Sequence, residues 1–380
     1  MSRIYANPRK GSKFPYKAEF SSTIDGVRAR RTRVFETEKE ANLWLAELSV
    51  SVAHGKKLVA ERMLFSDYFW QAYQVFKRRS VAATTEDTYR YTLRYIKKVL
   101  PKVTMRDLNR SLIQGFFNAL SDKLSHETQR KMLSQIRSVL ADAVDDGVLP
   151  HNPARRITLV ADPNRTKKPD AKFMSREDFF KIQTFLFDYK YRLSDVNRMA
   201  LFVITQAGLR AGECLALRDE DLDYESNTIS VTRSYDSLHE TIKEPKTPSS
   251  IRQIQIAPEA MLVIHKWSME HRKWLFQRGI PNPENLLFLN NQGELPRSRG
   301  LNAAYHQLQI RLGIEAKYST HTIRHTLASL MLDNKINIAY ISKFLGHSSV
   351  QITQQYYLSM LPDRMEQEAL KAINVTSIAK

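Results

Sequence analysis

The stretch LGHSSVQITQQYYLSML, Leu345 to Leu361, places two tyrosines side by side soon after a Gly-His pair. Tyr356 is nine residues after His347, and Tyr357 is ten residues after it. A side-chain hydroxyl can act as a nucleophile when neighbouring groups stabilise the charge that develops on its target. The stretch therefore raises two questions: whether one of these tyrosines reacts, and which other residues would assist it.

The whole chain is long and basic, which limits its partners. It has 380 residues, a formal net charge of +18 and a pI near 9.8. It can therefore hold two or three domains, and nucleic acid is the expected partner. No apolar run reaches the roughly 18 residues that span a bilayer, and the N-terminus lacks a secretory signal, so we expect a cytoplasmic protein without a membrane partner. The single cysteine, Cys214, excludes an internal disulfide and is expected to be a buried small hydrophobe.

Residues 1–60 are predicted to form a three-stranded sheet with one helix. Asp25-Gly26 joins two strand-like runs as a hairpin signal, and Thr37 with Glu40 forms a capping box at the start of the helix. The second run, VRARRTRVF, carries arginines without compensating acids. They could form a solvated basic edge strand, but the charge of the chain favours contact with DNA phosphates. These arginines are Arg28, Arg30, Arg31 and Arg33.

Residues 64–156 have the pattern of a helical domain. Apolar residues recur at helical spacing in two stripes, from Tyr89 to Leu100 and from Leu133 to Val144. Basic residues lie between the stripes, and charge alone does not decide whether that face binds DNA. Residues 157–172 contain two prolines and no apolar period, and they are expected to be an exposed linker. The candidate DNA contacts of the helical domain are Arg90, Arg94 and Arg130.

Residues 173–380 are predicted to form an α+β domain with a C-terminal tail. TISVTRSY and IRQIQI alternate as strands around EPKTPSS, which indicates a hairpin with Lys246 near its turn. Polar residues also gather in AGLRAGE, at 207–213, and in HTIRHTLAS, at 321–329.

Each of these segments is weak evidence alone. Arg210 and Glu213 could form an ordinary surface ion pair one helical turn apart. His321 and His325 have the spacing of a metal pair, but Thr322 stands where the HExxH motif has its glutamate. We therefore expect no metal.

Together and in this order, the segments resemble the catalytic domain of the tyrosine recombinases, the phage integrase family. The resemblance covers roughly residues 173–360. The head and the helical middle are similar to the arm-binding and core-binding domains of that family. It implies a multidomain, mainly α protein with small β-sheets: an arm-type DNA-binding domain at 1–60, a core-binding domain at 64–156 and a catalytic domain at 173–380.

The resemblance also assigns roles to individual residues. It implies that two arginines bind the non-bridging oxygens of a phosphodiester, that a lysine protonates the leaving 5′-oxygen, and that the histidines assist. Neither a metal, another cofactor nor ATP is implied. The matched positions are Arg210 with Glu213 in support, Lys246, His321, Arg324 and His347.

The resemblance favours Tyr357 as the nucleophile. Many members of the family read Tyr-x-His followed by apolar residues, and from Tyr357 this chain reads Tyr-Leu-Ser-Met-Leu-Pro. Ser359 departs from the histidine of that pattern, so Tyr356 stays an alternative. Adjacent helical residues point about 100° apart, so both tyrosines cannot occupy one site.

The implied function is site-specific recombination of double-stranded DNA at core-type and arm-type sites. Strands would be cleaved and rejoined through a 3′-phosphotyrosyl intermediate and a four-way junction, which integrates and excises a phage or mobile element. The implied partners are a homo-tetramer on DNA, a directionality factor and a host DNA-bending protein. The tail after Tyr357 could dock on a neighbouring subunit or fold back on its own domain. Two alternatives are a non-catalytic DNA-binding regulator, which would lack one of the polar residues, and a type IB topoisomerase.

Overall fold

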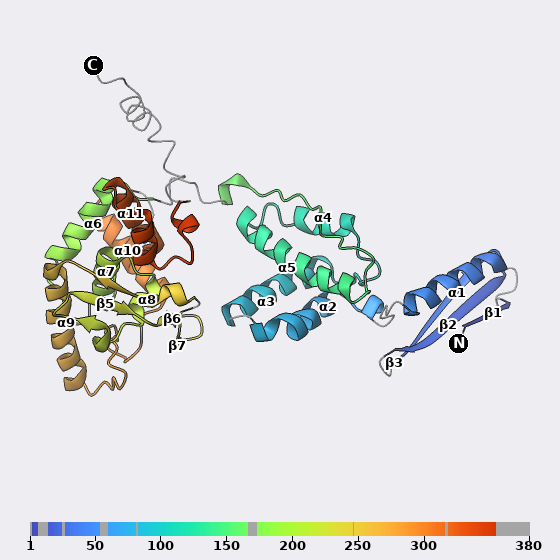
Figure 1. The fold of residues 1–380 in the computed structure, drawn as a ribbon, viewed down its shortest axis with the longest axis horizontal. Coiled ribbons are helices and arrows are strands. Elements are labelled where there is room, and N and C mark those ends of the chain that lie inside the picture. Colours follow the sequence, from blue (N-terminus) through green and yellow to red (C-terminus); the bar gives the residue numbers. More distant parts are fainter. Residues whose placement is uncertain are drawn as a thin grey trace, which may run out of the picture. The chain divides into compact units, whose positions relative to one another are not determined.

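The computed structural model describes residues 2–6, 14–24, 27–53, 60–80, 83–165, 173–245, 247–315 and 318–354. The chain divides into two compact units, residues 1–167 and 168–380. Helices dominate both units, and each sheet has only two or three antiparallel strands (Figure 1). The expected mainly α architecture with small sheets is therefore confirmed. Within the described ranges, no helix combines the length and apolar composition needed to cross a membrane.

The first unit begins with the predicted three-stranded sheet and its helix. The Asp25-Gly26 turn lies outside the described residues, but the strands on either side pair antiparallel as expected. The capping box is present, since the Thr37 N–H donates to Glu40 and the Glu40 N–H donates to the Thr37 hydroxyl at 3.2 Å. One face of the helix packs on the sheet around Ala18. The elements are β1 (Ser2–Ala6), β2 (Tyr16–Ile24), β3 (Val27–Phe35) and α1 (Glu38–Ala53).

A second core in this unit belongs to the helical part. Both predicted apolar stripes face this core, and Gly147 follows the last helix in the left-handed conformation, with φ of 67°. Two helices begin at side-chain caps, Asn109 and Ser125. A π-helical stretch, Tyr73–Lys77, extends the first helix. The helices are α2 (Phe65–Ala72), α3 (Ala83–Val99), α4 (Arg110–Asn118) and α5 (His126–Asp145).

The start of the expected linker differs from the expectation. The Thr158 N–H donates to the Gln114 side chain at 3.0 Å, and the Val160 carbonyl accepts from Gln129 at 3.0 Å. Side-chain amides with free donors and acceptors thus bind this irregular backbone to the helices. Residues 158–165 are therefore attached to the helical part, and residues 166–172 lie outside the described residues.

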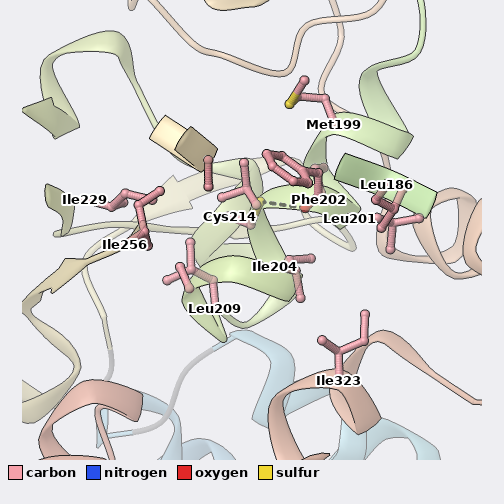
Figure 2. Packing of buried hydrophobic residues seen from close by; sticks show 14 of the residues in the cluster. Leu186, Met199, Leu201, Phe202, Ile204, Leu209, Cys214, Ile229, Ile256 and Ile323 are labelled. Carbon is pink, nitrogen blue, oxygen red and sulfur yellow. Dashed lines mark hydrogen bonds between the residues drawn. The ribbon is translucent and has the colours of Figure 1, made fainter. Parts of the chain in front are cut away.

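The second unit is built around α7, which is buried on nearly all sides. Such a helix must be hydrophobic all round, as the sequence NRMALFVITQAGL is. Cys214 belongs to this core together with Phe202 and Leu209, and its thiol donates to the Ala200 carbonyl at 3.5 Å (Figure 2). The helices are α6 (Arg176–Asp188), α7 (Val196–Ala207), α8 (Ala211–Leu215), α9 (Pro258–Gln277), α10 (Ser298–Arg311), α11 (Thr320–Asp333) and α12 (Ile338–Leu345).

The predicted pairing of TISV with RQIQ is confirmed, but the connection is not a simple hairpin. In the sequence, the segment between these two paired strands forms a separate two-stranded sheet. Its strands have three residues each, too few to show an alternating pattern. The strands of this unit are β4 (Leu222–Asp223), β5 (Thr228–Val231) and β8 (Arg252–Gln255) in one sheet, and β6 (Ser234–Asp236) and β7 (Thr241–Lys243) in the other.

Candidate active site

One pocket in the second unit, of about 480 Å³, is lined by polar residues from several separate segments. The predicted site residues in it come from the start of α8, the start of α11 and the turn after α12, and residues of β6 and of the β7–β8 connection line it as well. Lys246 and both tyrosines lie outside the described residues, but Pro245 and Thr247, on either side of Lys246 in the sequence, line the pocket. The predicted site residues on the pocket wall are Arg210, Glu213, His321, Arg324 and His347.

Glu213 holds Arg210 at the start of α8. The Arg210 guanidinium donates to Glu213 Oε1 at 2.6 Å, and the Arg210 backbone N–H donates to Oε2 at 3.0 Å. The Arg210 side chain is 39% exposed whereas that of Glu213 is 4% exposed. A buried carboxylate thus fixes an accessible guanidinium on the pocket wall, which is more than the ordinary surface pair considered from the sequence.

Gly212 allows α8 to lie directly against β6. A Cβ atom at this position would be 2.6 Å from the Tyr235 carbonyl oxygen and 2.8 Å from the Ser234 hydroxyl. Real Cβ contacts are essentially never that short, so only glycine fits without movement of the backbone. The second glycine of the AGLRAGE segment therefore has a packing reason to be there, beside the chemical reason for Arg210.

Among the candidate site residues that the structure describes, Arg324 is the most deeply buried, with 1% of its surface exposed. Its guanidinium donates to the Gly208 carbonyl at 2.8 Å and to the Leu345 carbonyl. These bonds connect α11 to the ends of α7 and α12. A guanidinium has five N–H donors, so one that also lines a pocket can bind an anion there.

His347 is buried beside these cations. Burial, followed by the charges of Arg324 and Arg210, lowers its pKa to about 3. The ring is therefore neutral at physiological pH, with one nitrogen that donates and one that accepts. Its Nδ1 lies 2.8 Å from the hydroxyl of the fully buried Thr353. A neutral ring can hydrogen-bond to a phosphate oxygen without adding charge to the site.

His321 is the exposed member of the set. It lies in the first turn of α11 and packs edge-on against His325, with ring centroids 4.3 Å apart. Within the residues that the structure describes, no three His, Cys, Asp or Glu side chains gather as a metal site. An imidazole at this place in the pocket can hydrogen-bond to a phosphate oxygen or transfer a proton.

Two residues at or near the pocket were missed by the sequence analysis. Lys243 lines it, although its ammonium is bound to Asp236 at 2.6 Å. Arg252 is buried behind the pocket and donates to Glu213 Oε2 at 3.0 Å. A signal for Arg252 existed: IRQIQI alternates, and Arg252 takes an inward position together with Ile254.

Two arginines of β3 have acidic partners elsewhere in the chain, although the run itself contains no acid. Arg30 pairs across the sheet with Glu19 at 2.5 Å, and Arg31 forms a largely buried pair with Glu61. Both acids are distant in sequence, so the run VRARRTRVF alone did not reveal them. Arg33 lies over the Phe35 ring, and the side chain of Arg28 lies outside the described residues.

The candidate DNA contacts of the helical part are exposed side chains, and each has a partner in its own helix. Arg90 binds Glu86 at 2.6 Å and Arg130 binds Glu127 at 2.9 Å. Arg94 lies 6.0 Å from the centre of the Tyr91 ring. Exposed ion pairs contribute little free energy, so these side chains can exchange their partners for phosphate at small cost.

Comparison with protein-family models gives two matches. Residues 178–361 match the model described as "Phage integrase family", and residues 64–159 match the model described as "Phage integrase SAM-like domain". The first match includes the whole candidate pocket.

Similar proteins cover most of the chain. The "Tyrosine recombinase XerC-like" protein of Caldanaerobacter subterraneus is 22% identical in an alignment of 373 residues that covers 92% of this chain and 93% of that protein. The "Integrase" of Staphylococcus phage L54a is 24% identical in an alignment of 319 residues that covers 79% of this chain and 88% of that protein.

Solved structures share the fold. The Tn1549 transposon integrase, in complex with transposon right end DNA, has a TM-score of 0.65 and 19% identity, covering 81% of this chain and all of that one. A lambda integrase dimer bound to a core site has a TM-score of 0.55 and 14% identity, covering 93% of each chain.

Proposed function

This chain belongs to the phage integrase family of tyrosine recombinases, and from that premise we propose a complete reaction for it. It cleaves and rejoins DNA strands at specific sites through a 3′-phosphotyrosyl intermediate and a four-way junction, and so integrates and excises a phage or mobile element. The observation that carries this proposal is the convergence of two arginines and two histidines, from separate segments, on one pocket.

The positive charge of the pocket suits a phosphodiester under attack. Negative charge develops on the non-bridging oxygens, and Arg210 and Arg324 bind them by charge-assisted hydrogen bonds. Both guanidinium groups are already fixed by protein acceptors before DNA arrives. Because the donors are already in place, no free energy is spent on moving them during the reaction, and the barrier is lower.

The covalent step in this proposal uses Tyr357, with Tyr356 as the alternative. The tyrosine oxygen bonds to phosphorus as the bond to the 5′-oxygen breaks, and Lys246 gives that oxygen a proton. We propose that His321 either accepts the tyrosine proton or binds the phosphate. The neutral His347 donates a hydrogen bond to a phosphate oxygen. Rejoining reverses these steps with a different 5′-hydroxyl, so the bond energy is conserved.

The remaining assignments follow the family architecture. We propose that residues 1–60 bind arm-type sites, that residues 64–156 bind core-type sites, and that residues 173–380 catalyse. The active species is a homo-tetramer on two DNA sites in the cytoplasm. A directionality factor and a host DNA-bending protein are the proposed accessory partners.

Covalent trapping tests the proposal. Bound duplexes are first selected from random-sequence DNA, and the selected site is built into a nicked suicide substrate. We expect an adduct that peptide mass mapping locates at Tyr357. The matched pair Tyr357→Phe and Tyr356→Phe should then differ, with only the first abolishing the adduct.

Other outcomes would redirect the proposal. An adduct at Tyr356 keeps the enzyme and changes the nucleophile. Tight binding without any adduct supports the non-catalytic regulator and overturns the reaction. Efficient relaxation of plasmids that lack the selected site supports a topoisomerase instead.

A further inference from the structure

The segments that form the candidate active site meet at Arg252, the first residue of β8. Its side chain is 2% exposed. The guanidinium makes three hydrogen bonds, each to a different segment. It donates to Glu213 Oε2 at 3.0 Å, to the Phe344 carbonyl at 2.7 Å and to the Ser250 carbonyl at 3.0 Å.

Each acceptor connects to a different part of the site. Glu213 holds Arg210, Phe344 belongs to the last turn of α12 before His347, and Ser250 belongs to the segment that follows Lys246. One buried side chain therefore connects the start of α8, the end of α12 and the segment that follows Lys246.

The contact with α12 is close enough to require glycine. Gly346 is left-handed, with φ of 63°, and a Cβ there would lie 2.9 Å from Arg252 Nη1 and 3.0 Å from Arg252 Cδ. The turn that presents His347 thus lies directly against Arg252. A change in the Arg252 side chain would leave this turn without its support.

The charges form an alternating series. Glu213 accepts a hydrogen bond from the Arg210 guanidinium at Oε1 and another from the Arg252 guanidinium at Oε2. Burial alone would raise the pKa of Glu213, but Arg252 and then Arg210 outweigh it and lower the pKa. A buried carboxylate that loses such a partner tends to take up a proton.

We propose that Arg252 is a positioning residue for DNA strand cleavage. It holds Glu213 so that Arg210 is fixed in the pocket, and it holds the end of α12 so that His347 is presented to the phosphate. It acts through these residues and is not itself a catalytic group. The assignment rests on the proposed cleavage function.

The test compares Arg252→Met and Arg252→Lys with the wild-type full-length protein. The probe is the nicked suicide duplex built on the selected site, and both affinity and single-turnover cleavage rate are measured. For Arg252→Met we expect an affinity within about 3-fold of wild type, because Lys and Arg elsewhere hold the backbone, and a rate about 100-fold lower. Arg252→Lys should be intermediate, because it keeps the charge but lacks the planar fork of donors.

The pH profile separates positioning from packing. In Arg252→Met, the pKa of Glu213 should rise, so the cleavage rate should increase with pH between about 5 and 8 beyond any wild-type dependence. Arg252→Lys should keep the wild-type profile. A loss of rate by the same factor at every pH in both variants would overturn the proposal.

Two further variants separate the proposal from a loss of folding. Arg233→Met is the matched control, because Arg233 pairs with the buried Asp221 at 2.8 Å and is not among the residues of the candidate site. It should lower the melting temperature while cleavage stays near wild type. The double variant Glu213→Gln/Arg252→Met removes both charges, so it should recover stability but not cleavage.

The outcomes distinguish the two levels of inference. If the wild-type protein binds the duplex but forms no adduct, the proposed function and the role of Arg252 both fail. If the wild type forms the adduct and Arg252→Met cleaves at the same rate, only the role of Arg252 fails. The same holds if Arg233→Met reduces cleavage as strongly as Arg252→Met does.

Discussion

Arg324 has a structural task and, in the proposed reaction, a catalytic one. Its guanidinium donates hydrogen bonds to two carbonyls at helix ends and lines the candidate pocket. Arg210, by contrast, has a partly exposed side chain that is fixed chiefly by Glu213. Substitution of the two arginines should therefore give the same catalytic defect with different costs in stability.

We predict that Arg324→Ala and Arg210→Ala each lower single-turnover cleavage by at least about 100-fold while DNA binding is retained. Arg324→Ala should also lower the free energy of unfolding by about 2 kcal/mol, because buried carbonyls lose their donor. Arg210→Ala should cost less stability. Gel-shift binding, suicide-substrate cleavage and urea unfolding measure the three quantities. Near-normal cleavage by either variant would show that the site is assigned incorrectly.

The lowered pKa of His347 leads us to predict that the free energy of unfolding depends on pH. Its pKa is about 3 in the folded chain and 6.5 for an ordinary histidine. Between these values the unfolded chain binds a proton that the folded chain does not. The free energy of unfolding should therefore fall as the pH drops from about 6.5 towards 3, by at most about 1.4 kcal/mol per pH unit for this group.

The variant His347→Gln should flatten this dependence in urea unfolding measured at several pH values. Burial also lowers the pKa of His271, to about 4, so His271→Gln should remove a separate part of the slope. An unchanged slope in His347→Gln would mean that this histidine is not held neutral by its surroundings.

At the scale of elements, the contact between α8 and β6 decides where Arg210 lies. Gly212→Ala would place a Cβ 2.6 Å from the Tyr235 carbonyl oxygen. We predict a loss of about 1–3 kcal/mol in the free energy of unfolding, together with slower cleavage, because α8 must move. Thermal unfolding and suicide-substrate cleavage measure the two effects.

Gly115→Ala is the matched control. Gly115 lies within α4 and is exposed, and a Cβ added there would meet no atom within 4 Å beyond its own turn of helix. Alanine there should raise stability by about 0.5–1 kcal/mol and leave cleavage unchanged. Equal behaviour of the two variants would contradict the close contact at Gly212.

Elements with strong local signals could be predicted from the sequence. The Thr37 capping box, the two apolar stripes and the buried α7 all depend on neighbours within one or two turns. The β6–β7 sheet was missed because its short strands have no pattern of their own. The acids that pair with Arg30 and Arg31 were missed because strand pairing and chain folding bring them close.

The candidate site shows the same division. The motifs located the five residues that the pocket brings together, because each motif is short and contiguous. They could not show that Arg252 joins α8 to α12, since Glu213 and Phe344 are 39 and 92 residues away from it in sequence. A buried polar contact over such separations is a property of the tertiary structure.

At the scale of the whole molecule, the head and the helical part of the first unit have separate cores. Residues 60–63 nevertheless belong with the helical part, because the Glu61 and Met63 carbonyls accept from the N–H groups of Arg106 and Met105. A truncated chain that lacks only the head should therefore begin at Ala60 rather than at Leu64.

We predict that the chain beginning at Ala60 cleaves a bare core site within about 3-fold of the wild-type rate but loses affinity for arm-type DNA. The salt dependence should change as well, since each lost phosphate contact lowers the slope of log affinity against log salt by about 0.9. Selection from random-sequence DNA with residues 1–59 present and absent identifies the arm site, and titrations at several salt concentrations give the slope.

The Arg31–Glu61 ion pair provides the control for this truncation, because the truncation also removes Arg31 from Glu61. Glu61→Gln in the full-length chain removes the charge of the same pair but keeps the sheet and all of its arginines. If the head is a separate DNA-binding module, this variant should keep its affinity for arm-type DNA, and core-site cleavage should survive in both proteins. Loss of core-site cleavage in the truncated chain alone would instead mean that the head supports the reaction itself.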